Sequence, residues 1–141
     1  MTTKPRYMLD FDICIAVQRG TSKAVTDRLL ALEPGEALLP LVVYGELRVG
    51  VEKSRHRERA MAALDTLLGG FPVADLSAEV ADVYGTIRAE LERRGETIGS
   101  NDLWIAAHAK AAGLTLVTGN EREFLRAAGL SVENWAIQGA R

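Results

Sequence analysis

Apolar and polar positions follow two patterns along this chain, and segments of the two patterns alternate. Short, almost wholly apolar runs predict buried strands, and they lie at residues 6–9, 37–40, 71–76 and 114–118, with a last strand or extended tail at 130–135. Stretches with apolar residues three and four positions apart predict helices, and they lie at residues 13–17, 21–33, 41–53, 54–68, 77–94, 99–113 and 121–128. This alternation predicts an α/β fold with a central, mainly parallel sheet flanked by helices.

The most apolar of the predicted helices, at residues 99–113, contains one acid, Asp102, in its first turn. Ser100 or Asn101 can cap this helix. The helix dipole and the unpaired backbone N–H groups of the first turn favour a carboxylate at this position. Taken alone, Asp102 is either an ordinary helix-start acid or a functional residue. The choice depends on whether other acids converge on it.

A second acid, Glu46, lies inside the predicted helix at residues 41–53, where it shares one helical face with Val42, Val49 and Gly50. A carboxylate on a mostly apolar helix is costly unless it is paired or bound to a metal ion. We therefore expect Glu46 to have a partner in the folded protein.

Two further polar positions fall where predicted strands end. Asp10 closes the first strand, and Asn120 follows the strand that ends at Thr118. Ligands of parallel sheets bind beyond the carboxyl ends of the strands, so we expect Asp10 and Asn120 to meet Glu46 and Asp102 there. Carboxylate and amide oxygens suit Mg²⁺ or Mn²⁺. Such a site supports phosphodiester hydrolysis, in which a metal-activated water attacks phosphorus.

Composition and charge narrow the class of protein. The 141 residues are enough for a real core, and we expect residues 1–141 to form a single domain. The net charge is −2, so a nucleic-acid partner would have to be held by a local basic patch. The single cysteine, Cys14, excludes an internal disulfide and a cysteine-rich zinc site, and we expect it to be buried. No apolar run approaches the ~18 residues of a membrane span, and the N-terminus has no apolar leader region, so we expect a cytoplasmic protein.

Several short blocks around these positions follow one another in a fixed order. They are Met8-Leu9-Asp10, Val43-Tyr44-Gly45-Glu46-Leu47, Tyr84-Gly85-Thr86-Ile87-Arg88, Gly99-Ser100-Asn101-Asp102-Leu103 and Leu116-Val117-Thr118-Gly119-Asn120. In this order and spacing, across nearly the whole chain, they resemble the PIN-domain ribonuclease toxins of the VapC type.

The resemblance implies a PIN-like three-layer fold and a metal-dependent endoribonuclease, the toxin of a type II toxin–antitoxin module that cleaves structured RNA such as tRNA or rRNA. It implies Mg²⁺ or Mn²⁺ as cofactor, a VapB-type antitoxin as partner and a homodimer. Asp10, Glu46 and Asp102 match the metal-binding triad. Asn120 matches the fourth polar position of the catalytic site, with Glu123 as a nearby supplement. Thr118 matches the hydroxyl residue that precedes that position.

The chain departs from the family pattern at two places. The family commonly has Asp-Thr-Asn where this chain has Asp10-Phe11-Asp12, and many members have Asp where this chain has Asn120. Phe11 removes a hydroxyl that could orient Asp10, so it bears on efficiency, although we expect activity to survive. Asp12 either caps the helix at residues 13–17 or helps to bind metal. We favour the cap, because Asp is a preferred N-cap residue.

Two other functions fit parts of the sequence. Phe11 and the neutral Asn120 fit a non-catalytic PIN-fold module that binds RNA or protein. Asp10-Phe11-Asp12 also mimics the start of haloacid-dehalogenase-like phosphatases, in which the first Asp is the nucleophile. That alternative leaves Glu46 and Asp102 without a role.

The remaining residues that could take part in catalysis or RNA binding can also be explained by a structural role. We expect His108 to be packed and hydrogen-bonded, and Trp104 and Trp135 to form core or dimer contacts rather than to stack on bases. A basic run after Glu46 fits an RNA contact and a solvated helix surface equally well. The run consists of Arg48, Lys53, Arg55, His56, Arg57 and Arg59.

Overall fold

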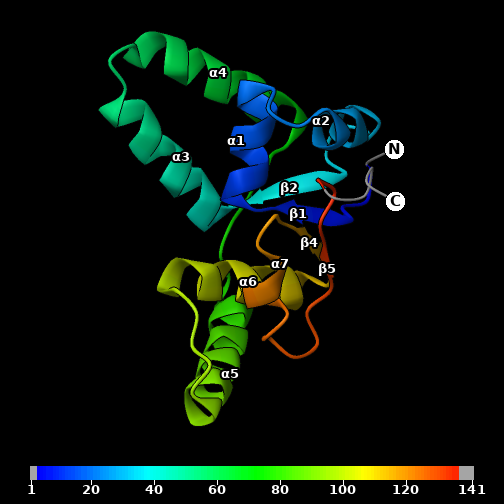
Figure 1. Cartoon of the computed structure of the whole chain (residues 1–141), viewed down its shortest axis with the longest axis vertical. Helices are drawn as coiled ribbons and strands as arrows, with labels where there is room; N and C mark the ends of the chain where they lie inside the picture. Colours follow the sequence, from blue (N-terminus) through cyan, green and yellow to red (C-terminus); the bar gives the residue numbers. More distant parts are fainter. Residues whose placement is uncertain (1–2, 137–141) are drawn as a thin grey trace.

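A parallel sheet forms the centre of the computed structural model, which describes residues 3–136 (Figure 1). The order of its strands is β3-β2-β1-β4-β5, and each neighbouring pair runs parallel. Tyr7 on the central strand lies opposite Ala37 on one side and Thr115 on the other. The mainly parallel α/β sheet is therefore confirmed. The strands are β1 (Tyr7–Leu9), β2 (Ala37–Pro40), β3 (Val73–Ala74), β4 (Thr115–Val117) and β5 (Val132–Glu133).

Helices cover both faces of this sheet. In the view of Figure 1, α1 to α4 lie above the sheet and α5, α6 and α7 lie below it, which gives three layers. In the part of the chain that the structure describes, no helix is both long and apolar enough to cross a membrane. The helices are α1 (Phe11–Arg19), α2 (Lys23–Leu30), α3 (Leu41–Lys53), α4 (Arg57–Gly70), α5 (Ala78–Arg94), α6 (Ser100–Ala112) and α7 (Glu121–Phe124).

The start of α1 differs from the sequence prediction. The helix begins at Phe11, because the Asp10 side chain accepts a hydrogen bond from the Phe11 amide at 2.7 Å and acts as the N-cap. Asp12 therefore lies inside the first turn, and its predicted role as N-cap is wrong. Both acids satisfy the cap preference equally well, so local sequence could not separate them.

Several element limits also differ. Pairing of the third and fifth strands is confined to two residues each, in place of the longer runs predicted. Helix α4 ends at Gly70, two residues beyond the predicted limit, and α7 ends at Phe124, short of the predicted limit. In α3 the buried stripe is Val43, Leu47 and Val51, whereas Val49 on the predicted face is 53% exposed. Glu46 therefore lies at the edge of the buried stripe and not within it.

The core confirms the structural readings of several single residues. Cys14 is fully buried, and the Trp135 ring meets Tyr7 edge-on at 5.0 Å between centroids. Trp104 on α6 stacks on Tyr84 of α5, with centroids 3.9 Å apart, so both indoles serve packing. His108 is 3% exposed, as expected for a packed histidine.

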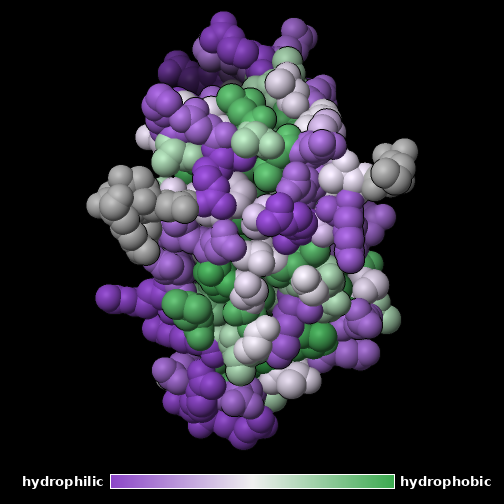
Figure 2. Space-filling model, turned by 90° about the vertical axis from the view of Figure 1, so that its right-hand side faces the viewer, coloured by the Kyte–Doolittle hydropathy of each residue, from purple (hydrophilic) through white to green (hydrophobic). Residues whose placement is uncertain are grey.

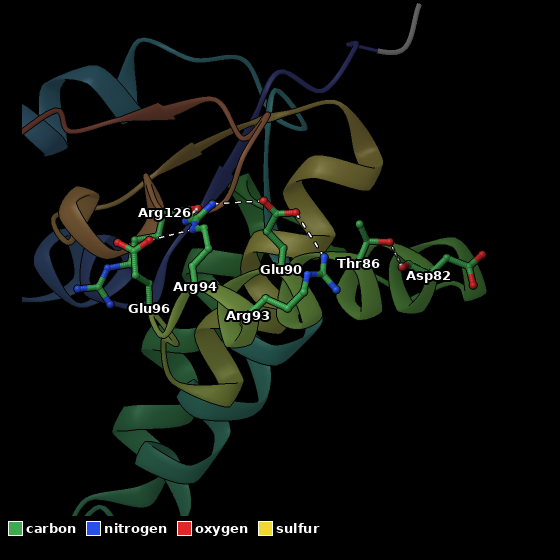
Figure 3. Close-up of polar contacts among 7 residues, drawn as sticks. All are labelled: Asp82, Thr86, Glu90, Arg93, Arg94, Glu96 and Arg126. Atoms are coloured by element: carbon green, nitrogen blue, oxygen red, sulfur yellow. Dashed lines mark hydrogen bonds and ion pairs between the residues drawn. The ribbon is translucent and has the colours of Figure 1, made fainter.

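Arginine contacts fix the turn between α5 and α6 (Figure 3). Arg94 bonds the carboxylates of Glu90 and Glu96, and its Nη2 donates to the carbonyl oxygen of Arg126 at 2.9 Å. Arg126 in turn donates to the carbonyl oxygen of Thr97 at 3.1 Å. These bonds join the α5–α6 turn to the segment after α7. They therefore hold the start of α6, with Asp102, at a fixed position relative to α7.

Candidate active site

The carboxylate of Asp10 is buried where β1 ends, and two donors orient it. It is 6% exposed. Its Oδ1 accepts from the Phe11 amide, and its Oδ2 accepts from Thr118 Oγ1 at 2.7 Å. Thr118 is fully buried and also accepts the Asn120 amide at 2.9 Å. Asp10 thus keeps a hydroxyl partner, although Phe11 carries none.

Burial is the main reason that the pKa of Asp10 rises from its usual range to about 7. The nearby charges of Asp12 and Asp102 raise this pKa further. The hydrogen bonds from Thr118 and Phe11 act in the opposite direction, because they stabilise the charged form. A neighbouring positive charge would be needed to keep Asp10 ionised well below neutral pH.

Asp102, in the first turn of α6, lies among several other acids. Its pKa is raised first by burial and then by the charges of Glu123, Glu46 and Asp12, and a hydrogen bond with the Glu123 carboxyl group adds to the shift. Together with the influence of Asp102 on Asp10, this shows that acids of four separate segments lie close enough to affect one another's pKa. The three predicted carboxylates, Asp10, Glu46 and Asp102, thus belong to one electrostatically coupled group.

Glu46 approaches this cluster from α3. Burial raises the pKa of its carboxyl group, and the Asn101 side chain opposes the shift. Within residues 3–136 the buried atom Oε1 of Glu46 has no hydrogen-bond partner. A buried carboxylate oxygen without a donor is costly, so this atom is the one most in need of a cation.

Asn120 follows β4 at the turn into α7, and its side chain pairs with Glu123. Its Nδ2 donates to Glu123 Oε2 at 3.1 Å. Asn120 thus orients Glu123, and Glu123 faces Asp102. The sequence indicated Glu123 only as a supplement. The spacing of three residues at the start of a helix was the signal that the two side chains could meet.

Asp12 is also part of the cluster, in a way that the sequence did not reveal. Its Oδ2 accepts the backbone amide of Gly119 at 2.9 Å. Burial raises the pKa of Asp12. The backbone amides of Gly119, Ile13 and Asp12 itself oppose this shift. The hydrogen bond with Gly119 explains why an acid stands at position 12, although Asp12 is not the N-cap of α1.

The donor set fits a divalent cation of the hard type. All candidate ligands are carboxylate or amide oxygens, which suit Mg²⁺ or Mn²⁺. Within residues 3–136, no three side chains of Asp, Glu, His or Cys are arranged around a single position that could hold a metal ion. Mg²⁺ commonly uses one or two carboxylates and keeps several waters, so a complete protein cage is not required. The raised pKa values and the unpartnered Glu46 Oε1 are the features that a bound cation would relieve.

Two other candidate groups lie apart from these acids or are already engaged. His108 lies beyond Asp102 along α6, where its ring is close to the backbone of Asp75. In the basic run, Arg48 and Arg57 both pair with Glu52, at 2.8 and 2.7 Å. These two arginines therefore have the solvated, paired arrangement of an ordinary helix surface.

Comparison with known proteins places the chain and its fold in a family. The model of the PIN domain matches residues 7–130. Ribonuclease VapC2 of Rickettsia felis is 39% identical over 130 residues, which cover 92% of this chain and 97% of that protein. The tRNA(fMet)-specific endonuclease VapC of Shigella flexneri is 39% identical over 131 residues, covering 93% and 98%. DNA-bound VapBC from Salmonella typhimurium contains a chain of the same fold, with a TM-score of 0.88, 34% identity and coverage of 94% and 99%. The chain therefore belongs to the PIN-domain family and, within it, to the VapC-type ribonucleases.

Proposed function

We propose that this protein is a divalent-metal-dependent endoribonuclease and the toxin of a toxin–antitoxin pair. The observation that carries the proposal is the electrostatic coupling of the acids Asp10, Glu46, Asp102 and Glu123, with raised pKa values at the first three. Relatives at 39% identity bear the names ribonuclease and endonuclease. Membership of the PIN-domain family removes the reason to consider a haloacid-dehalogenase-like phosphatase.

In this proposal Asp10, Glu46 and Asp102 hold the cation, and Asn120 acts through Glu123. Thr118 orients Asp10 by its 2.7 Å hydrogen bond, and the start of α6 supplies a rigid base for Asp102. A bound Mg²⁺ or Mn²⁺ would supply an activated water and would screen the negative charge that develops on the scissile phosphate. Glu123 lies beside Asp102, where the 3.1 Å hydrogen bond from Asn120 Nδ2 orients its carboxylate.

We propose tRNA as the first RNA substrate to test, because the Shigella flexneri relative is named a tRNA(fMet)-specific endonuclease. The chain's net charge of −2 argues against general attraction to RNA. Selection of an RNA would therefore depend on a local surface. Lys53, Arg55 and Arg59, which are exposed beside α3 and α4, are the members of the basic run available for that contact.

We also propose a VapB-type antitoxin as partner, since the similar Salmonella typhimurium structure is a VapBC complex. An apolar groove of about 480 Å³ between the end of α1, α2 and α4 fits an apolar segment of such a partner. Leu30 at its rim is 78% exposed, and Figure 2 shows that apolar patches interrupt the polar surface on the side of the molecule that lies to the right in Figure 1. The VapC resemblance further leads us to propose a homodimer. A monomer in sedimentation equilibrium at micromolar concentration would contradict it.

Induced expression followed by mapping of new 5′ ends in total RNA tests the proposed function. We expect one discrete set of cleaved RNAs with the unaltered chain and with Asp65→Asn, because Asp65 is an exposed acid on α4, a helix apart from the acid cluster. We expect none with Asp102→Asn. New ends that persist in Asp102→Asn would contradict the proposed site. No new ends with any variant would favour the non-catalytic module.

A further inference from the structure

Asp12 and Gly119 are in unusually close contact, although 107 positions separate them in the chain. The Gly119 amide donates to Asp12 Oδ2 at 2.9 Å. A Cβ atom at position 119 would lie 2.5 Å from the same oxygen, so the Asp12 carboxylate would have to move away to make room for it. Gly119 does not have a positive φ, so its backbone conformation does not require glycine. The absence of a side chain at Gly119 instead allows the Asp12 carboxylate to approach this closely.

This contact holds the turn that follows β4. Thr118, on one side of Gly119, is fixed by its bond to Asp10, and the Asn120 amide bonds back to Thr118 Oγ1. Asp12 adds an anchor from a different element, the first turn of α1. The turn is thereby fastened at two successive residues to the corner where β1 enters α1.

The turn matters because it leads directly into α7, which is only four residues long and carries Glu123. A helix of one turn has almost no stability of its own, so its position depends on how its ends are held. Glu123 must lie against Asp102 and Asn120 to make the contacts described above. An anchor at Gly119 is therefore an anchor for the carboxylate of Glu123.

We propose that Asp12 is a positioning residue of the nuclease site, whose carboxylate fastens the Gly119 amide and so sets Asn120 and Glu123 against Asp102. This inference rests on the proposed ribonuclease function. Asp12 Oδ2 accepts the Gly119 amide at 2.9 Å, and the backbone amides of Ile13 and of Asp12 itself also stabilise the charged carboxylate. A carboxylate engaged in this way acts through the turn that it holds. In this proposal Asp12 is a positioning residue and not a metal ligand, and Asp10 has the cap role.

Two substitutions separate positioning from metal binding. Asp12→Ala removes the acceptor, whereas Asp12→Asn keeps an oxygen at the same place and removes the charge. With Asp12→Ala we expect kcat to fall roughly tenfold to a hundredfold with little change in KM, because small displacements of catalytic groups cost rates of that order. The Gly119 amide should exchange its hydrogen faster, and Mn²⁺ affinity by calorimetry should stay within about threefold of the unaltered protein. Asp12→Asn should recover most of the rate and of the amide protection.

Two results would overturn the inference. If Asp12→Asn loses as much activity and Mn²⁺ affinity as Asp12→Ala, the charge matters and Asp12 is a ligand. If Asp12→Ala changes neither the rate nor the exchange of the Gly119 amide, the contact positions nothing. Asp65→Asn serves as the control for loss of one surface charge.

A second pair of variants tests the contact without any RNA. Gly119→Ala should lower the midpoint of chemical unfolding in the unaltered chain, because its methyl group meets Asp12 Oδ2. In an Asp12→Ala background the same change should cost much less. Equal costs in both backgrounds would contradict the contact. If the protein cuts no RNA, the proposed function fails, and this cycle with the Gly119 exchange rate still decides whether the anchor exists.

Discussion

Thr118 donates its hydroxyl hydrogen to the carboxylate of Asp10, with 2.7 Å between Oγ1 and Oδ2, and both side chains are buried. The same hydroxyl oxygen accepts the Asn120 amide, so one side chain links an acid at the end of β1 to the turn after β4. The strand ends are joined by this hydrogen bond as well as by the sheet.

Thr118→Val replaces that hydroxyl with a methyl group of nearly the same size. We expect a loss of about 1–3 kcal/mol in the free energy of unfolding, because a buried carboxylate and an amide each lose a partner. The pKa of Asp10 should rise further, so cleavage at pH 7 should fall and recover partly at higher pH. Thr118→Ser keeps the hydroxyl and is the matched control. A pH profile identical to that of the unaltered protein would contradict the role given to Thr118.

Asp10 should make the metal-free protein less stable as the pH rises. Its folded pKa, about 7, lies above its unfolded value of 3.8, so the folded state binds more protons between these values. The contribution of Asp10 is therefore most favourable below about pH 4 and is lost as the pH rises to about 7. It amounts to a few kcal/mol at most, since one pKa unit corresponds to about 1.4 kcal/mol.

Chemical unfolding of the metal-free protein and of Asp10→Asn across this pH range measures the effect. The difference in stability should move in favour of Asp10→Asn as the pH rises, and Mn²⁺ should reverse it for the unaltered protein only. A difference that does not vary with pH would contradict the burial of an uncompensated carboxylate.

His108 should make the protein sensitive to acid. Burial lowers its pKa below the usual 6.5, and within residues 3–136 its Nδ1 has no hydrogen-bond partner. The unfolded chain therefore takes up the proton first. The stability due to a neutral His108 is complete above about pH 6.5 and is lost as the pH falls toward the lowered folded value.

His108→Gln should flatten the pH dependence of unfolding just below pH 6.5, even if it lowers stability overall. His56 is exposed at the start of α4 and offers the matched variant, His56→Gln, which should leave the curve unchanged. An acid-induced loss that survives in His108→Gln would show that another group causes it.

Arg94 should matter more than its neighbour Arg93, although both carry the same charge at the end of α5. Arg94 donates to the Arg126 carbonyl oxygen and so links the end of α5 to the segment after α7. Among the ion pairs of the described residues, Arg93 contacts only Glu90. We expect Arg94→Met to lower stability by about 1 kcal/mol and to reduce cleavage. Arg93→Met should stay within about 0.5 kcal/mol. Equal effects of the two substitutions in unfolding and cleavage assays would contradict the role of the Arg94–Arg126 hydrogen bond.

The sequence predicted the order of strands and helices well, because each element carries its own apolar rhythm. It also indicated that Asp10, Glu46 and Asp102 would meet, because strand ends and helix starts gather at one edge of a parallel sheet. The role of these residues as metal ligands stays a prediction. Asp12 was misplaced as a cap, because its partner Gly119 lies 107 positions away and no local rule reveals such a contact. The orientation of the Asn120 side chain likewise depends on its hydrogen bond to Glu123, which the position of Asn120 after a strand does not reveal.

Cleavage of tRNA by the purified protein, with and without a divalent cation, tests the central claim most directly. With Mg²⁺ or Mn²⁺ we expect discrete products from the unaltered protein and from Asp65→Asn. We expect no products from Asp10→Asn or Asp102→Asn, and none from any variant after chelation. Products that persist in Asp102→Asn, or that form equally well in excess chelator, would contradict a metal-dependent ribonuclease site built on these carboxylates.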